Sequence, residues 1–428
     1  MKKVKVIILL SVVLLAAASC RKMDFYPHNA YSRYNVGEEE MPLFYVGLYN
    51  CSQYKPTTDG YYAPDIMGGD LERAGGSAGF TPAAQVQALV IPNGGFINGP
   101  WTGYYSWLYQ VNCFIESAQK MTDGADKDLY RGTGHFFRGL IYYHLTSRWR
   151  SVPILRVPTN DPVASSSEAD CWAFVEEELE AAAALLGSFS GDNTYVSRQA
   201  AQALLARTCL AQGKMSEAAR YAETVITSGH FALDTYENLW DKDKSVEVIF
   251  AYSNAGADEN GIKLGDMFRG SPQYIPTAEF GRQVLTNDER YGWLHYADGR
   301  YITFNKYNTY GGYDPIMVTR LSEMYLISAE AQGRSAGLGR LNELRNKRGL
   351  PALEAFASEE EFVDAILAER RLELAGEGFR WFDLVRTGRY EATLGLDSRY
   401  NVLPIPEEQI NRSKGVLKQN PVWSKVEE

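Results

Sequence analysis

Several motifs that mark metal sites and common enzymes are missing from the sequence. Only 5 of the 428 residues are cysteine, and no two of them have CxxC spacing, which disfavours a zinc site or a dithiol redox centre. The 5 histidines show no HExxH spacing, and there is no P-loop. We therefore expect no metal, no cofactor and no enzymatic activity. Cys113 and Cys209 lie in apolar helical patterns, which predicts buried free thiols.

Long apolar runs and positive charge are also scarce. The single long apolar run, residues 6–18, is too short to span a bilayer as a helix, which excludes a polytopic membrane protein. The 43 basic residues are outnumbered by 53 acidic residues, for a net charge of −10. Because a negative surface repels phosphate backbones, we do not expect nucleic acid as a partner. The hydrophobic share of 45% and the charged share of 22% are those of an ordinary globular protein.

The first twenty residues have the pattern of a secretory signal peptide. Three lysines within residues 2–5 precede the apolar run, and small residues follow it up to Cys20. We therefore predict a signal peptide over residues 1–19. A cleavage site before a cysteine resembles a bacterial lipobox, in which the cysteine is acylated and anchored to a membrane. The alternative is a secreted protein with an incidental Cys20, since Ala17 replaces the usual leucine.

A helical hairpin is predicted between residues 197 and 228. Ser197 is placed to cap the first helix and Gly213 to end it, and Ser216 is placed to cap the second. Small residues inside both helices allow the two backbones to approach closely. Two helices of this length joined by a short turn are typical of a tetratricopeptide-type unit, although the full 34-residue consensus is absent.

Further amphipathic patterns predict more helices along the chain. They cover residues 168–186, 320–332, 338–349 and 359–378. In the last of them the core face is marked by Val363, Ile366, Leu367 and Leu374. Its charged residues are expected to point mostly outward.

The remaining chain is predicted to form mostly loops with short helices. Residues 21–100 and 254–315 are rich in Gly, Asn, Asp, Pro and aromatics, and residues 245–253 are the best strand candidate. No low-complexity linker marks a domain boundary, so we predict one mainly helical domain in which helical hairpins form a scaffold under a loop-rich layer. The expected parts of this single domain, 20–428, are 20–160, 161–253, 254–318 and 319–428.

Six segments together resemble one known family. They are residues 101–112, 129–155, 195–233, the pair 320–331 and 341–351, 369–389, and 401–423. In this order they are similar to the SusD/RagB family of outer-membrane lipoproteins from Bacteroidetes, and ERRLELAGEGFRWFDLVRTGR (369–389) is the most specific of them. Ser151 and Gly376 depart from the family pattern, which usually has Gly and Phe there.

The resemblance implies a surface-exposed binding lipoprotein of the outer membrane. Such proteins sit over a SusC-like TonB-dependent transporter and deliver an oligosaccharide to it. Their fold is a set of tetratricopeptide-like helical pairs with a loop-rich face for the ligand. The alternative is a peptide- or protein-binding component of a peptide importer of the RagB type, because helical-repeat surfaces often bind peptides.

Aromatic residues are unevenly distributed, and a sugar binder needs flat aromatic faces. Residues 96–109 hold six aromatics in 14 positions and residues 291–313 hold eight in 23, whereas residues 163–230 hold five in 68. Some rings in the two rich stretches are therefore expected to face solvent. The candidate stacking residues are Tyr104, Trp107, Trp293, Tyr296 and Tyr301. By contrast, Trp101, Tyr105, Leu108 and Asn112 share one helical face, which predicts core positions for Trp101 and Tyr105.

Polar candidates for binding sugar hydroxyls come from the predicted loop over residues 61–76 and from one position beyond it. They are Asp65, Asp70, Glu72, Arg73 and Asn98. The alternative is a turn that the aspartates fix by their own hydrogen bonds. A glycoside hydrolase would need a carboxylate pair such as Asp70 and Glu72 across a cleft.

The FRWFDL segment is predicted to be structural rather than ligand-binding. Arg380 and Arg386 are placed to pair with Glu377 and Asp383 at a spacing of three residues.

Overall fold

A computed structural model describes most of the chain. It covers residues 36–54, 57–76, 81–240, 245–254, 264–308 and 314–424. The predicted signal peptide and Cys20 lie outside these residues. Within the described part, Cys113, Cys171 and Cys209 are buried free thiols, which confirms the prediction for Cys113 and Cys209.

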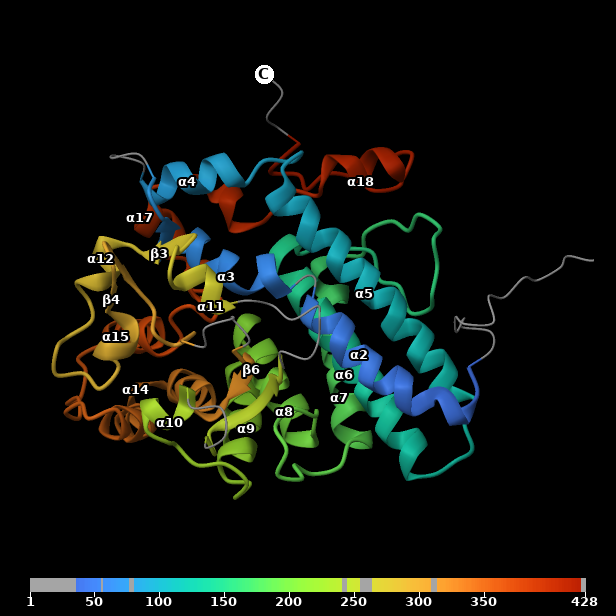
Figure 1. Ribbon diagram of the computed structural model, residues 1–428, viewed down its shortest axis with the longest axis horizontal. Coiled ribbons are helices and arrows are strands. Elements are labelled where there is room, and N and C mark those ends of the chain that lie inside the picture. The colour runs from blue at the N-terminus through green and yellow to red at the C-terminus, as the bar shows by residue number, and fades with distance from the viewer. Residues whose placement is uncertain are drawn as a thin grey trace, which may run out of the picture.

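The chain is mainly helical, as predicted, and its first half is a series of packed helices. These are α2 (Met41–Tyr54), α3 (Thr57–Met67), α4 (Pro82–Leu89), α5 (Gly95–Gln119), α6 (Ala125–Trp149), α7 (Glu168–Leu185), α8 (Arg198–Ala211) and α9 (Met215–Ile226), preceded by the 3₁₀ turn η1 (Glu38–Glu40). Helices α5 to α9 lie side by side in chain order, and α9 packs on α14 of the second half (Figure 1).

The second half mixes short elements with two long helices. Its helices are α10 (Tyr236–Trp240), α11 (Leu264–Phe268), α12 (Ala278–Gly281), α13 (Tyr291–Leu294), α14 (Leu321–Lys347), α15 (Glu359–Glu373), α16 (Arg380–Arg386), α17 (Tyr390–Leu394), the 3₁₀ turn η2 (Ser398–Asn401) and α18 (Glu407–Arg412). The strands are β1 (Leu71–Arg73), β2 (Val248–Tyr252), β3 (Tyr274–Pro276), β4 (Tyr296–Asp298), β5 (Tyr301–Thr303) and β6 (Ile316–Arg320).

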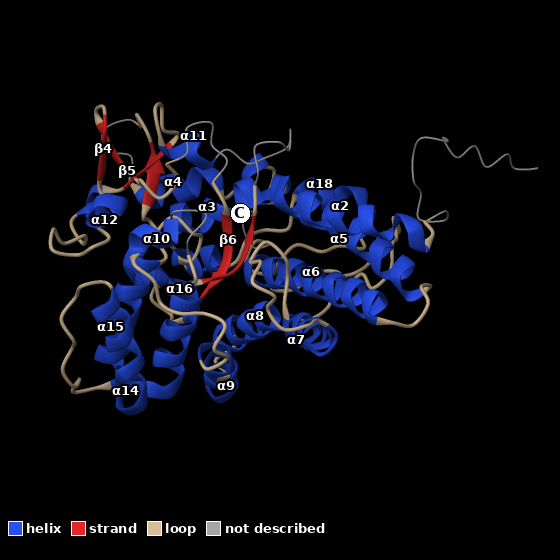
Figure 2. Ribbon diagram, turned by 60° about the horizontal axis from the view of Figure 1, so that its bottom comes forward, coloured by secondary structure: helices blue, strands red, loops and turns tan. Residues whose placement is uncertain are grey.

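The described strands form three antiparallel pairs, β1 with β3, β2 with β6, and β4 with β5. The pair β2–β6 lies inside the molecule, and all five residues of β2 are buried, which confirms the strand predicted over residues 245–253. The other two pairs lie at one end of the longest axis (Figure 2). The stretch 254–315, predicted as loops with short helices, thus also carries the short strands β3, β4 and β5.

The hairpin of α8 and α9 carries most of the helix-end signals predicted from its sequence. The Ser197 side chain accepts a hydrogen bond from the backbone of Ala200 and caps α8, and Gly213 has a φ of +71°, which suits the end of a helix. The prediction for the second cap was wrong: Lys214 is the N-cap residue of α9, and Ser216 lies inside the helix.

The C-terminal helices also match. The two helices predicted over residues 320–332 and 338–349 both form, as the two parts of α14, which is interrupted at Gly333 by a non-helical backbone with a φ of +71° and a ψ of 171°. At Gly337 a Cβ atom would lie 1.9 Å from the carbonyl oxygen of Ala329, so only glycine fits there.

The charges of α15 do not all face outward as predicted, because Glu369, Arg370 and Glu373 are buried. Glu373 accepts hydrogen bonds from Arg320 at 2.5 Å and Arg348 at 2.8 Å. Burial alone would raise the pKa of Glu373, yet the two guanidinium groups hold it well below its usual range. This ion cluster joins α15 to β6 and to the end of α14.

No helix in the described part of the chain is both long enough and apolar enough to cross a membrane.

Candidate ligand-binding site

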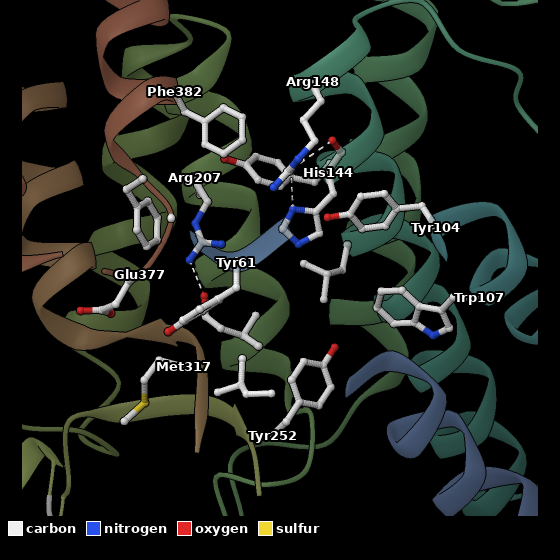
Figure 3. A pocket seen from close by; sticks show the side chains of 16 residues that line it. Tyr61, Tyr104, Trp107, His144, Arg148, Arg207, Tyr252, Met317, Glu377 and Phe382 are labelled. Atoms are coloured by element: carbon white, nitrogen blue, oxygen red, sulfur yellow. Dashed lines mark hydrogen bonds between the residues drawn. The ribbon is translucent and has the colours of Figure 1, made fainter. Parts of the chain in front are cut away.

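Tyr104 and Trp107 lie in the core and not on an exposed loop. Both belong to α5, where they are 2% and 3% exposed. Tyr104 stacks on His144 at a centroid distance of 5.3 Å, and Trp107 packs on Phe137 at 5.6 Å. They line a cavity of about 60 Å³ between α5, α6 and β6 (Figure 3). Ligand pockets usually measure about 300–1,000 Å³, so this cavity cannot hold a sugar ring, and the expectation of solvent-facing rings is wrong for both residues.

Asp65 and Asp70 are also buried, at 2% exposed each. Asp65 accepts hydrogen bonds from the backbone nitrogens of Gly378 at 2.9 Å and Arg380 at 3.1 Å. Asp70 pairs with the guanidinium of Arg371 at 2.6 Å. Their prediction as binders of ligand hydroxyls is corrected, because both carboxylates hold the end of α3 against α15 and α16.

The structure brings the end of the 61–76 segment close to Tyr301, one of the predicted aromatics. Arg73 of β1 is opposite Tyr274 of β3, and a Cβ atom on Gly75 would lie 3.5 Å from the Tyr301 hydroxyl. Glu72 is partly buried and Arg73 is exposed. Residues 61–76 and 291–303, both selected from sequence, thus meet at one end of the molecule.

In the β4–β5 hairpin, Tyr296 and Tyr301 lie on the same side, and the other side presents Ala297 and Ile302 to solvent. Each tyrosine ring is already covered by a cation, Tyr296 by Arg269 at 4.5 Å and Tyr301 by Arg300 at 4.7 Å. Both rings are partly buried, and so is Trp293, which packs near Tyr236. A ligand-binding role for these three aromatics stays a prediction.

The largest concave surface described lies elsewhere, along the outer side of α5. We call it the α5 groove. It measures about 540 Å³ and runs between α5, the segment 153–163 and α18. Its lining comprises Trp101, Thr102, Tyr105, Ser106, Leu108, Tyr109, Gln110, Asn112, Pro153, Leu155, Val157, Pro158, Thr159, Asn160, Asp161, Pro162, Val163, Gln409, Arg412, Ser413 and Leu417.

The floor of the α5 groove is the helical face that sequence analysis assigned to the core. Trp101 is buried, as predicted, and Tyr105 is partly buried, with ring centroids 5.0 Å apart. The Tyr105 hydroxyl donates to the Pro153 carbonyl at 3.0 Å, and Asn112 Nδ2 donates to the Leu155 carbonyl at 2.9 Å. These bonds fix the segment that forms one wall.

The two rims of the α5 groove are held by local bonds. The Thr159 hydroxyl accepts from the backbone nitrogen of Asp161 at 3.0 Å, between two prolines whose φ is fixed. On the other rim, Asn98 Nδ2 donates to Glu408 at 2.8 Å, and Gln409 Nε2 donates to Asn98 Oδ1 at 3.1 Å. Asn98 therefore docks α18, and a direct contact of Asn98 with a ligand stays a prediction.

The α5 groove is close to electrically neutral. Arg412 is paired with Glu408 at 2.5 Å, and the remaining charge among the lining residues is that of exposed Asp161. Hydroxyls and amides line its rims, from Thr102, Ser106, Gln110, Asn160 and Gln409. A floor of aromatic and aliphatic carbon beneath neutral hydrogen-bonding groups suits a polar, uncharged ligand.

In the FRWFDL segment, the pair of Arg386 with Asp383 forms at 2.9 Å, as predicted. The pair of Arg380 with Glu377 does not form, because Glu377 is bound by Lys306 at 2.7 Å and by Arg320 at 2.9 Å. Trp381 is buried and its indole nitrogen donates to the Tyr400 carbonyl.

Two family models match the chain over most of its length. One is described as SusD family and matches residues 235–402, and the other is described as starch-binding associating with outer membrane and matches residues 44–210. The chain belongs to the SusD family. This confirms the resemblance found in the sequence.

Sequence relatives in this family are distant. The chain is 23% identical to the SusD-like protein P38 of Formosa agariphila over 371 residues, which covers 69% of this chain and 73% of the relative. It is 22% identical to a SusD-like protein of Bacteroides ovatus over 369 residues, which covers 69% of this chain and 66% of that protein.

Solved structures share the fold. A laminarin-binding SusD-like protein superposes with a TM-score of 0.76 at 22% identity, over 90% of this chain and 99% of the other. The surface glycan-binding protein A from Bacteroides thetaiotaomicron, solved in complex with laminarihexaose, gives a TM-score of 0.75 at 21% identity, over 90% and 99%. Identities this low establish the common fold alone.

The sequence missed the α5 groove because its walls are far apart in the chain. The signal that was available is the pair of prolines around TND, residues 158–162, which marks a stiff loop. Its position over α5 depends on long-range hydrogen bonds.

Proposed function

We propose that the protein is a cell-surface glycan-binding lipoprotein that captures an uncharged oligosaccharide or polysaccharide. The α5 groove is the observation that carries the proposal, because its volume of about 540 Å³ suits a short stretch of sugar units. Its floor offers ring faces for the C–H patches of pyranoses, and its rims offer neutral donors and acceptors for hydroxyls. The laminarin-binding SusD-like protein and the surface glycan-binding protein A solved in complex with laminarihexaose support this ligand class.

The proposal includes a place in the cell. Acylated Cys20 would anchor the protein in the outer membrane, and a SusC-like transporter would receive the glycan. The matched family description, associating with outer membrane, supports the location. In this proposal the protein binds and delivers its ligand without chemical change.

The first test is a binding screen of residues 21–428 against laminarin, starch, host glycans and peptides, followed by isothermal titration. We expect one glycan class to bind with a Kd between about 1 μM and 1 mM, that is about −8 to −4 kcal/mol. Binding to peptides alone would contradict the proposal and favour a peptide importer of the RagB type.

The site is tested by Ser106→Trp, which places a large side chain from an exposed position into the α5 groove without removing a core contact. Gln119→Trp is the matched control, since Gln119 is exposed on the same helix and does not line the groove. We expect at least a tenfold weaker Kd for Ser106→Trp and an unchanged Kd for the control. Equal Kd values for the two variants would show that the ligand does not bind in the α5 groove.

A further inference from the structure

The small cavity beside Tyr104 and Trp107 is lined by hydrogen-bond donors. His144 of α6 and Arg207 of α8 face it from two helices, and the hydroxyls of Tyr104 and Tyr252 reach it from α5 and β2 (Figure 3). Its volume of about 60 Å³ is far below that of a sugar site but exceeds the share of liquid volume of one water molecule, about 30 Å³. The cavity has room for a small solute.

The protonation of His144 is set by its neighbour. Arg148 Nη1 lies 3.1 Å from His144 Nδ1, and a guanidinium can only donate, so Nδ1 is the acceptor. Burial and the charges of Arg148 and Arg207 lower the pKa of His144 well below its usual value. The neutral ring therefore carries its proton on Nε2, and no acceptor for that proton is found in the described part of the chain.

Arg207 has a donor to spare as well. Its Nε and Nη2 atoms bind the two carboxylate oxygens of Glu323 at 2.5 Å each, and Nη2 also donates to the Val318 carbonyl at 2.6 Å. No hydrogen bond of Nη1 is found within the described residues. The acidic residue in the lining, Glu377, already has both oxygens engaged by Lys306 and Arg320. The described residues thus offer no free hydrogen-bond acceptor for His144 Nε2 and Arg207 Nη1 at this cavity.

We propose that this cavity is a binding site for a small monovalent anion, a halide or a one- or two-carbon carboxylate. Such an ion would accept from His144 Nε2 and from Arg207 Nη1, beside the hydroxyls of Tyr104 and Tyr252, and would link α6 to α8. A guanidinium pair with Glu323 leaves no excess charge on Arg207, so the ion is held by hydrogen bonds in a low-dielectric space. The site is separate from the α5 groove and does not depend on the proposed glycan function.

Crystals grown in sodium bromide provide the direct test, because bromide is located by its anomalous scattering. We expect a bromide peak in the cavity of the unsubstituted protein and none in His144→Phe, which keeps the ring stack on Tyr104 but removes the donor. His230→Phe is the control, since His230 is exposed and remote from the lining. If His144→Phe does not fold, Tyr252→Phe, which removes a lining hydroxyl and keeps its ring, takes its place with a weaker expected peak.

A solution measurement accompanies the crystals. Melting temperature is compared in chloride, bromide, formate, acetate and gluconate at equal ionic strength, and a ligand that binds only the folded state raises it. We expect a rise of about 1–2 °C for the halides or the small carboxylates over gluconate, lost in His144→Phe and kept in His230→Phe. A cavity without bromide, together with equal melting temperatures in all five salts, would overturn the proposal. A rise with formate or acetate and not with halides would assign the carboxylate.

Discussion

The two sides of α5 differ although both are rich in aromatic residues. One side carries Tyr104 and Trp107, packs against α6 and leaves a small space of about 60 Å³. The other carries Tyr105 and Tyr109 and forms the floor of an open groove of about 540 Å³. The number of aromatic residues on a helix therefore does not show which of its sides can bind a ligand. The segments that cover each side decide it.

The largest expected contrast is in stability. Trp107→Ala removes a fully packed indole from the closed side of α5 and should lower the free energy of unfolding by about 3–5 kcal/mol. Chemical denaturation followed by circular dichroism measures it. Glycan affinity per folded molecule should stay unchanged, because Trp107 does not line the α5 groove. A stable variant that has lost binding would reverse the assignment of the two sides.

The matched substitution on the open side should behave in the opposite way. Tyr109→Ala removes a partly exposed ring from the groove and should weaken the Kd about tenfold, which corresponds to about 1.4 kcal/mol. Its effect on the free energy of unfolding should stay below about 1 kcal/mol, as is usual for positions near the surface. Isothermal titration and denaturation on the same sample separate the two quantities. Tight binding by this variant would exclude ring stacking at Tyr109.

How far the sequence predicts this structure depends on the range of the interactions involved. The hairpin of α8 and α9 was predicted because the Ser197 cap and the Gly213 stop are local signals. The sequence predicts loop positions for Asp65 and Asp70, because their partners, Gly378 and Arg371, are about 300 positions away. No local pattern reveals such a pair.

The same argument applies to the candidate site. Helical periodicity predicts that Trp101 and Tyr105 share one face of α5, and the structure confirms this prediction. This face can be covered by other core residues or left accessible to a ligand, depending on the position of residues 153–163 and α18. That position is fixed by long-range hydrogen bonds, such as the one from Tyr105 to Pro153. Burial of α15 charges was missed for a similar reason, since their partners Arg320 and Arg348 lie in other elements.

A subtler change tests how the groove wall is held. Tyr105→Phe keeps the ring on the floor and removes the hydroxyl that donates to the Pro153 carbonyl. We expect a loss of about 1 kcal/mol in the free energy of unfolding, and a severalfold weaker Kd because the wall is less well fixed. Hydrogen exchange of residues 153–163 should become faster. Unchanged exchange would show that the Asn112 bond to Leu155 is enough to hold the wall.

The smallest expected effect concerns the pH dependence of the closed side. The pKa of His144 is lowered in the folded protein by burial and by Arg148 and Arg207, so below about pH 6.5 the unfolded chain binds a proton that the folded protein does not. Stability should therefore fall as the pH drops from 7.5 to 5.5, by at most about 1.4 kcal/mol per pH unit from this residue. Tyr143, which also faces the ring, stays uncharged in this range because burial raises its pKa.

Asp65 acts in the opposite direction within the same window. Burial raises its pKa to about 7, so its contribution to stability is present at low pH and is lost as the pH rises through that value. The comparison of the unsubstituted protein with His144→Phe cancels the Asp65 contribution, because Asp65 is present in both. Urea unfolding at pH 7.5 and 5.5 should give a smaller loss of stability for His144→Phe. An equal loss in both proteins would mean that His144 gains its proton over the same pH range in the folded and the unfolded protein. The folded protein would then hold a charged ring at pH 5.5, and the assignment of a neutral ring with its proton on Nε2 would be wrong.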